Sequence, residues 1–232
     1  MNNTHDALMM QKTIEIFMEP GKVFEIRALD VKVNYGRVEN WSGFFQYTGD
    51  NSNQITNEIL KLKPAKGIYF TINPIDESLL ALGYNRLAPS RRDGSTGDRD
   101  ILRRKWLPID IDPVRKSGTS ATDQAVQLAN YKAFDVVNYL KNEGFADPVI
   151  AFSGNGYHLL YPIDEPREDN GLIQRFLQNL ASHFDDDKVK IDTAVHNPSR
   201  IMRFYGSVAR KGDEVPALGI HHRVARILSV PN

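Results

Sequence analysis

The chain has 232 residues, of which 41% are hydrophobic and 25% are charged, so it can bury a core as one large domain or two small ones. It has no cysteine, which excludes disulfide bonds and thiolate zinc sites and leaves carboxylate, imidazole and carbonyl groups as candidate metal ligands. Lys plus Arg and Asp plus Glu both number 29, and this zero net charge argues against a protein that binds nucleic acid through charge alone.

The first part of the chain carries few regular signals. Apolar and β-branched residues predict strands at residues 23–29 and 67–72. The segments 49–53 and 88–100 lack apolar periodicity, so we expect loops there, the second of them mobile. Basic residues form two groups, each of which fits a solvated surface or an anion contact. The groups are Arg91, Arg92, Arg99, Arg103, Arg104 and Lys105, and Arg200, Arg203, Arg210 and Lys211.

The second part begins with a strand and a helix. Alternation over residues 106–112 predicts a strand that ends at Pro113. Apolar residues then recur at helical spacing, with Ser120 as the expected N-cap and Gly144 as the stop.

A hairpin, a second helix and further strands are expected after this helix. Residues 149–152 and 158–161 predict two strands joined by a glycine turn, and residues 172–180 predict a helix. Short strands are expected at 189–192 and 201–204. This order indicates an α+β lobe, with a mainly antiparallel sheet that helices cover on one face.

Three carboxylates are candidates for metal chemistry. Asp110 and Asp112 project from the same face of their strand, about 6.7 Å apart along it, while Ile111 points to the core. Phosphoryl transfer often uses two divalent ions about 3.5–4 Å apart, and carboxylates favour Mg²⁺ or Mn²⁺. Asp192 ends another strand. The alternatives are an ordinary surface pair for the first two, and the start of a turn for Asp192.

Two other strings could bind an anion. In SGNGYH, the glycines allow close backbone approach, Ser153 and Asn155 offer donors, and His158 begins the next strand. A plain hairpin turn with a core histidine is the alternative. Arg200 and Arg203 lie close to Asp192 in the sequence, and arginine matches phosphate oxygens in a bidentate way.

Taken in order, LPIDID, SGNGYHLLYPI and KIDTAVHNPSRIMRFYGS resemble the three motifs of the archaeo-eukaryotic primase superfamily. The resemblance is to the primase-polymerase cores of plasmid, phage and CRISPR-associated replication proteins, and it covers the chain from about residue 67 to the end. It implies a single catalytic domain of two lobes. These are an N-terminal α/β lobe at about residues 1–100 and a lobe related to RNA-recognition modules at residues 101–232.

The resemblance also implies roles for residues. Asp110, Asp112 and Asp192 would be catalytic and hold two Mg²⁺ or Mn²⁺ ions, with no zinc. The nucleotide site would consist of Ser153, Asn155, His158, Arg200, Arg203, Asn73 and Lys211.

The implied activity is template-directed joining of dNTPs or NTPs by two-metal nucleotidyl transfer, with single-stranded DNA template and primer as partners. A nucleic-acid-binding module without chemistry and a metal-dependent nuclease are the alternatives. A replication-initiator nuclease fits poorly, because its His-hydrophobic-His site is missing: His221 and His222 are adjacent and would lie on opposite faces of a strand.

The ends of the chain and its setting give the remaining expectations. Relatives often continue into a helicase or a helical accessory domain, which this chain lacks, so it could be an excised core. The chain shows neither a signal-peptide pattern nor an apolar run of membrane-spanning length. We therefore expect a cytoplasmic protein with no membrane partner.

Overall fold

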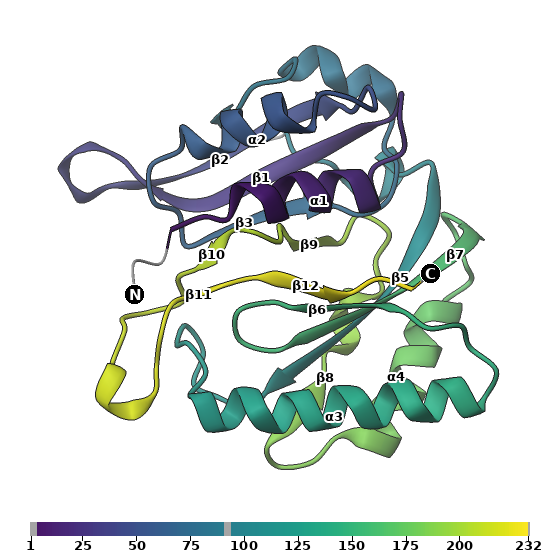
Figure 1. Ribbon diagram of the computed structural model, residues 1–232. Helices are drawn as coiled ribbons and strands as arrows, with labels where there is room; N and C mark the ends of the chain where they lie inside the picture. The colour runs from purple at the N-terminus through teal and green to yellow at the C-terminus, as the bar shows by residue number, and fades with distance from the viewer. Residues whose placement is uncertain (1–3, 91–93, 232) are drawn as a thin grey trace.

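A computed structural model describes residues 4–90 and 94–231 of the chain. It contains two five-stranded sheets, one in each lobe, and a small third sheet of two strands (Figure 1). All pairings between the named strands are antiparallel. The expected fold class, α+β with mainly antiparallel sheet, is therefore confirmed.

The first sheet has the order β4-β2-β1-β3-β9. Its strands are β1 (Val23–Lys32), β2 (Val38–Gln46), β3 (Gly67–Thr71), β4 (Ala88–Pro89) and β9 (Ile201–Arg203). Helices α1 (Ala7–Phe17) and α2 (Ser52–Leu60) join one face of this sheet in a common apolar core. Asp6 caps α1 by accepting a hydrogen bond from the Met9 amide, and α1 buries Met10, Ile14 and Phe17 at helical spacing.

The second sheet has the order β12-β6-β7-β5-β8. Its strands are β5 (Arg103–Pro113), β6 (Val149–Phe152), β7 (Tyr157–Pro166), β8 (Val189–Ile191) and β12 (Arg226–Ser229). Helices α3 (Asp123–Asn142) and α4 (Leu172–Phe184) pack on one face, where they bury Ile109 and Ile111 of β5. The other face is left free to meet the first lobe.

Short elements complete the fold. The third sheet pairs β10 (Val208–Ala209) with β11 (Arg223–Val224). The 3-10 turns are η1 (Asn34–Gly36), η2 (Glu77–Leu82), η3 (Asp98–Asp100), η4 (Thr193–His196) and η5 (Pro216–Leu218). Within the described ranges, no helix has the length and apolar character needed to cross a bilayer.

The start of α3 differs from the prediction. Thr122, and not Ser120, is the N-cap, because the Thr122 hydroxyl accepts a hydrogen bond from the Ala125 amide at 3.1 Å. The Ser120 hydroxyl instead donates a hydrogen bond to the Lys211 carbonyl at 2.8 Å. This bond joins the segment before α3 to the segment that follows β10.

The predicted strand at residues 201–204 forms, but in the other lobe. As β9, it pairs with β3, so that Arg203 lies opposite Tyr69 and Met202 opposite Phe70. Met202 and Phe70 are both buried in the core of the first lobe, which explains why the strand crosses over. The chain therefore returns to the first lobe after leaving it, and no single boundary near residue 100 separates the two lobes.

Candidate active site

Three polar side chains form a row across neighbouring strands of the second sheet. Strand β5 lies between β7 and β8, and its register places Asp110 opposite His158. On the other side, Ile111 pairs with Ile191, and the Asp192 amide donates to the Asp110 carbonyl at 2.8 Å. Directly opposite residues in a sheet lie about 4.5–5.5 Å apart. The sheet thus brings His158, Asp110 and Asp192 together on the face opposite α3 and α4.

Asp110 is the central member of this row. Its Oδ1 atom is buried and has no hydrogen-bond partner among the described residues. Burial raises the pKa of the Asp110 carboxyl well above its ordinary value, and the nearby charges of Asp112 and Asp192 raise it further, while Lys211 and Arg115 act in the opposite direction. A positive charge at this position would relieve the unfavourable environment.

His158 is a buried neutral side chain. It is 4% exposed, and burial lowers its pKa to about 3, with Arg203 and Lys211 adding to this effect and Asp112 opposing it. Its Nδ1 atom lies 2.7 Å from the Tyr205 hydroxyl, and its Nε2 atom lies 3.5 Å from Asp110 Oδ1. At neutral pH, this second contact is therefore not an ion pair.

Asp112 depends on the glycine turn of the hairpin. Gly156 has no room for a side chain, because a Cβ atom there would stand 2.5 Å from Asp112 Oδ1. The carboxylate is also bound by Arg115, whose Nη2 atom lies 3.2 Å from Asp112 Oδ2. Arg115 is held in turn by the carbonyls of Pro113 and Thr119. Sequence reasoning missed Arg115, although its place three residues after Asp112 was a usable signal.

The hairpin turn itself forms as predicted. The Ser153 amide donates to the Gly156 carbonyl at 2.9 Å, and the Ser153 hydroxyl accepts from the Gly156 amide at 3.0 Å. Asn155 is buried, and its side-chain oxygen accepts from the Ala121 amide at 2.8 Å. Both residues line the cleft, but these contacts commit the Ser153 hydroxyl to the turn and the Asn155 oxygen to the segment before α3.

Two arginines also line this cleft. Arg203 belongs to β9, and Arg200 directly precedes that strand. Arg203 on β9 is 4% exposed, and its Nη2 atom donates to the Tyr69 hydroxyl at 2.9 Å. Its Nε and Nη1 atoms are buried without a hydrogen-bond partner in the described part of the chain. Arg200 donates to the Ala194 carbonyl, and its Nε atom is likewise buried and unpaired there. Donors in this state are costly unless an acceptor arrives.

All these side chains line one cleft of about 270 Å³. It brings together nine of the ten predicted site residues: Asp110, Asp112, Asp192, Ser153, Asn155, His158, Arg200, Arg203 and Lys211. Residues that sequence reasoning did not include also line it: Arg115, Tyr69, Leu29, Val195, Ile201 and Met202.

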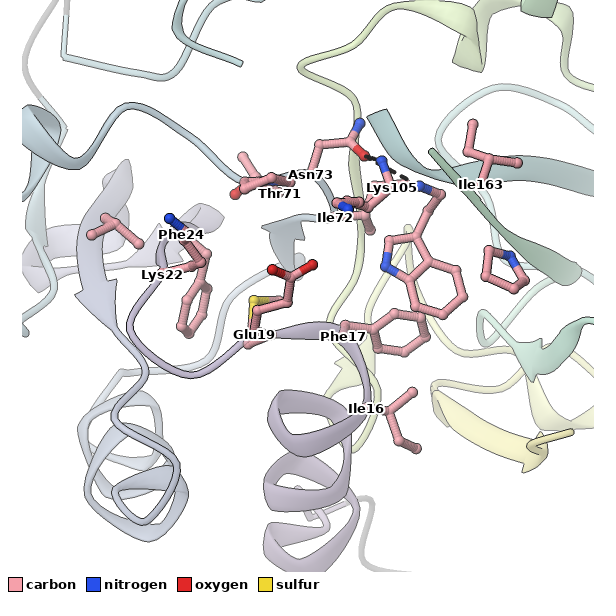
Figure 2. A pocket seen from close by; sticks show the side chains of 15 residues that line it. Ile16, Phe17, Glu19, Lys22, Phe24, Thr71, Ile72, Asn73, Lys105 and Ile163 are labelled. Atoms are coloured by element: carbon pink, nitrogen blue, oxygen red, sulfur yellow. Dashed lines mark hydrogen bonds between the residues drawn. The ribbon is translucent and has the colours of Figure 1, made fainter. Parts of the chain in front are cut away.

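Asn73 is the predicted site residue that the structure places elsewhere. It lines a separate hollow of about 250 Å³ between the α1–β1 turn and β5 (Figure 2). Its side-chain oxygen accepts from the Lys105 amide at 2.7 Å, and its Nδ2 atom donates to the Pro198 carbonyl at 2.9 Å. The amide is buried and satisfies backbone groups, which explains why it does not serve the cleft.

Three members of the first basic group lie at the start of β5 and pair with acidic side chains. Arg104 is 6% exposed, lies 3.4 Å from an Asp169 oxygen, and donates to the His196 carbonyl at 2.7 Å. Lys105 and Arg103 both pair with Asp164. Arg91 and Arg92 of this group lie outside the described residues.

The acidic residues fit a divalent ion in part. Carboxylate oxygens are the ligands that Mg²⁺ and Mn²⁺ prefer, and the unpaired buried oxygen of Asp110 beside Asp112 suits a cation. In residues 4–90 and 94–231, however, no group of three or more His, Asp or Glu side chains is placed to hold a metal. One oxygen of Asp192 is already engaged, because its Oδ1 atom accepts from the Ala194 amide at 2.8 Å.

Comparison with known proteins gives matches in structure alone. No family model matches the chain, and no curated protein matches its sequence. The crystal structure of primase RepB′ matches with a TM-score of 0.47 and 12% identity, over 96% of this chain and 56% of that chain. The present chain thus spans about half of that protein's length.

Two further structures show a similar level of likeness. The catalytic domain of primase RepB′ in complex with initiator DNA has a TM-score of 0.41 and 13% identity, over 88% of this chain and 79% of that one. The polymerase domain of ligase D from Mycobacterium tuberculosis in complex with DNA has a TM-score of 0.45 and 15% identity, over 93% and 83%. These two neighbours are a primase domain and a polymerase domain.

Proposed function

We propose that the chain is a metal-dependent nucleotidyltransferase of the primase-polymerase type, which joins dNTPs or NTPs on a single-stranded DNA template. The observation that carries this proposal is the composition of the cleft. The carboxylates of Asp110, Asp112 and Asp192 stand at one sheet, beside buried guanidinium nitrogens of Arg200 and Arg203 that have no hydrogen-bond partner among the described residues. A nucleoside triphosphate bound with divalent cations suits such a cleft, because the cations would neutralise the carboxylates and the phosphates would neutralise the arginines.

Asp110 and Asp112, joined by Asp192, would hold two Mg²⁺ or Mn²⁺ ions. These ions would supply stabilisation of the attacking and leaving oxygens. Asp192 is exposed and uses Oδ1 to accept from the Ala194 amide, so it would offer its other oxygen, Oδ2, to a cation.

The cationic side chains would hold the triphosphate. Arg203 and Arg200 have unpaired guanidinium nitrogens, and Lys211 lies close enough to shift the pKa of Asp110. His158 is neutral, so it would donate a hydrogen bond to a phosphate oxygen without adding charge. Arg115 would keep Asp112 oriented.

A nuclease with the same carboxylates is the second candidate, because two-metal hydrolysis uses similar ligands. Buried arginine donors favour a triphosphate, since a hydrolase that cleaves a single phosphodiester has fewer oxygens to bind. A binding module without chemistry would bind without metal.

One assay separates these candidates. The protein is incubated with a single-stranded DNA template, labelled dNTPs or NTPs, and Mn²⁺ or Mg²⁺, with and without a primer, and the products are resolved on a denaturing gel. We expect strands that lengthen only when nucleotide and metal are both present. Shortened DNA that forms without nucleotide would establish the nuclease, and unchanged DNA in all conditions would contradict both enzymes.

A further inference from the structure

A second, larger hollow opens beside the cleft. It has a volume of about 620 Å³ and lies over β1, β2 and the segment after β4. Leu29 and Ile201 line both this hollow and the cleft, so the two spaces share a border. The remaining lining includes Arg27, Asn40, Ser90 and Ser95, which are polar. We call this space the side groove.

The floor of the side groove is the face of the first sheet that α1 and α2 leave open. Strand register places Arg203 opposite Tyr69, Tyr69 opposite Arg27, and Arg27 opposite Ser42. Paired residues share a face, so this row of polar side chains runs from the cleft across the sheet into the side groove. Arg203 also stands over the Tyr69 ring, at 4.3 Å from the ring centre.

One wall of the side groove is fixed by hydrogen bonds at both ends. The Thr96 amide donates to buried Glu25 at 2.9 Å, and Arg27 donates to the Thr96 carbonyl at 2.7 Å. Two residues later, Asp98 accepts from the Ser199 hydroxyl at 2.6 Å. Ser95 is exposed and directly precedes the first of these anchors. The wall is therefore preorganised. Its second anchor, Asp98, binds Ser199, which directly precedes Arg200.

The two ends of the cleft differ in chemistry. Arg115 and Lys211 accompany the carboxylates, whereas Leu29 and Ile201 form the border with the side groove. A nucleotide whose triphosphate lies among the charges would turn its base toward the apolar border. The base that pairs with it would then stand in the next space along, which is the side groove.

On this basis, and resting on the proposed function, we propose that the side groove binds the single-stranded template at the position that pairs with the incoming nucleotide. The polar floor suits the sugar-phosphate chain and base edges, which single-strand sites contact through polar and cationic groups. Glu39 also lines the groove, but Arg37 lies 3.6 Å from it and offsets its charge.

A pair of charge changes at Ser95 tests this proposal by the sign of the effect. A DNA strand in the groove brings phosphates near the wall, so S95K should tighten and S95E should weaken the binding of a single-stranded oligonucleotide, each by about threefold to fivefold at moderate salt. Binding is measured by fluorescence anisotropy of a labelled oligonucleotide in EDTA, without nucleotide. The matched controls are S182K and S182E, at an exposed serine of α4 on the far side of the second sheet.

Opposite shifts at Ser95, with no shift at Ser182, would support the side groove as the template site. Equal shifts at both positions would show an effect of net charge alone and would overturn the proposal, as would unchanged binding at Ser95. The proposed function is judged separately, by primer extension. If primers are extended but S95K and S95E bind DNA like the parent, only the template site is rejected. If the two variants shift DNA binding in opposite directions but no primer is extended, only the proposed activity is rejected.

Discussion

His158 and Asp110 are neighbours in the cleft, and burial changes the pKa of both in opposite directions. Their place on one sheet face could be predicted from alternation along the strand, as could that of Asp112. Tyr205 could not be predicted as the partner of His158, because contacts between distant segments depend on strand register and loop path. The structure places Asn73 outside the cleft for a related reason: a sequence does not show which backbone groups a side-chain amide will satisfy.

The Tyr205 hydroxyl should fix the tautomer of His158. Burial raises the pKa of Tyr205 well above its ordinary value, so the hydroxyl stays protonated and can donate to Nδ1, which leaves the imidazole proton on Nε2 beside Asp110. For Y205F we expect a shift toward the Nδ1-H tautomer, seen in the ¹⁵N NMR signals of His158, and a loss of about 1 kcal/mol of stability. Y157F, a buried tyrosine on the opposite face, is the control. Unchanged nitrogen signals in Y205F would refute this assignment.

Asp110 should make stability fall as pH rises. The folded protein keeps its proton to a higher pH than the unfolded chain does, so above the ordinary carboxyl pKa of 3.8 the unfolded state is increasingly favoured. D110N removes this cost. In EDTA, its melting temperature should therefore exceed that of the parent more at pH 7 than at pH 4, by about 2–4 °C for each kcal/mol relieved. A constant difference across this range would contradict the pKa shift.

Strand β9 shows what local sequence could and could not predict at the scale of elements. A short strand was expected at residues 201–204, but a local sequence does not name a partner strand, and β9 joins the first sheet. Strands β5 to β8 and helices α3 and α4 were predicted because their signals are regular, whereas β12 of the same sheet was not predicted. Helices α1 and α2 were not predicted, although α1 carries buried residues at helical spacing.

Gly67 on β3 should be required for the position of the Arg203 side chain. A Cβ atom at Gly67 would overlap the Nη1 atom of Arg203, so G67A should displace this guanidinium from the cleft. We expect affinity for a nonhydrolysable nucleotide, measured by calorimetry with Mn²⁺, to fall about tenfold. G83A is the matched control, because a Cβ at Gly83 meets nothing nearer than 3.9 Å. Equal affinities of G67A and the parent would exclude Arg203 from nucleotide binding.

The two lobes form one continuous structure at the scale of the whole molecule. One apolar core contains Phe17 and Phe70 of the first lobe together with Leu160 and Ile227 of the second sheet. Because β9 also belongs to the first sheet, the arginine that it carries is brought to the acidic row by tertiary packing. The sequence motifs indicated which residues line the cleft. The pairing of β9 with the first sheet explains how Arg203 reaches it.

Primer extension by D110N and by D135N tests the central claim most directly. Asp110 lies in the acidic row, whereas Asp135 is exposed on α3, behind the second sheet. With template, primer, nucleotides and Mn²⁺, we predict that D110N loses at least 100-fold in extension rate, roughly the effect of removing a main electrostatic group from an active site, while D135N matches the parent. Extension by a folded D110N at the parental rate would contradict the assignment of this cleft as the active site.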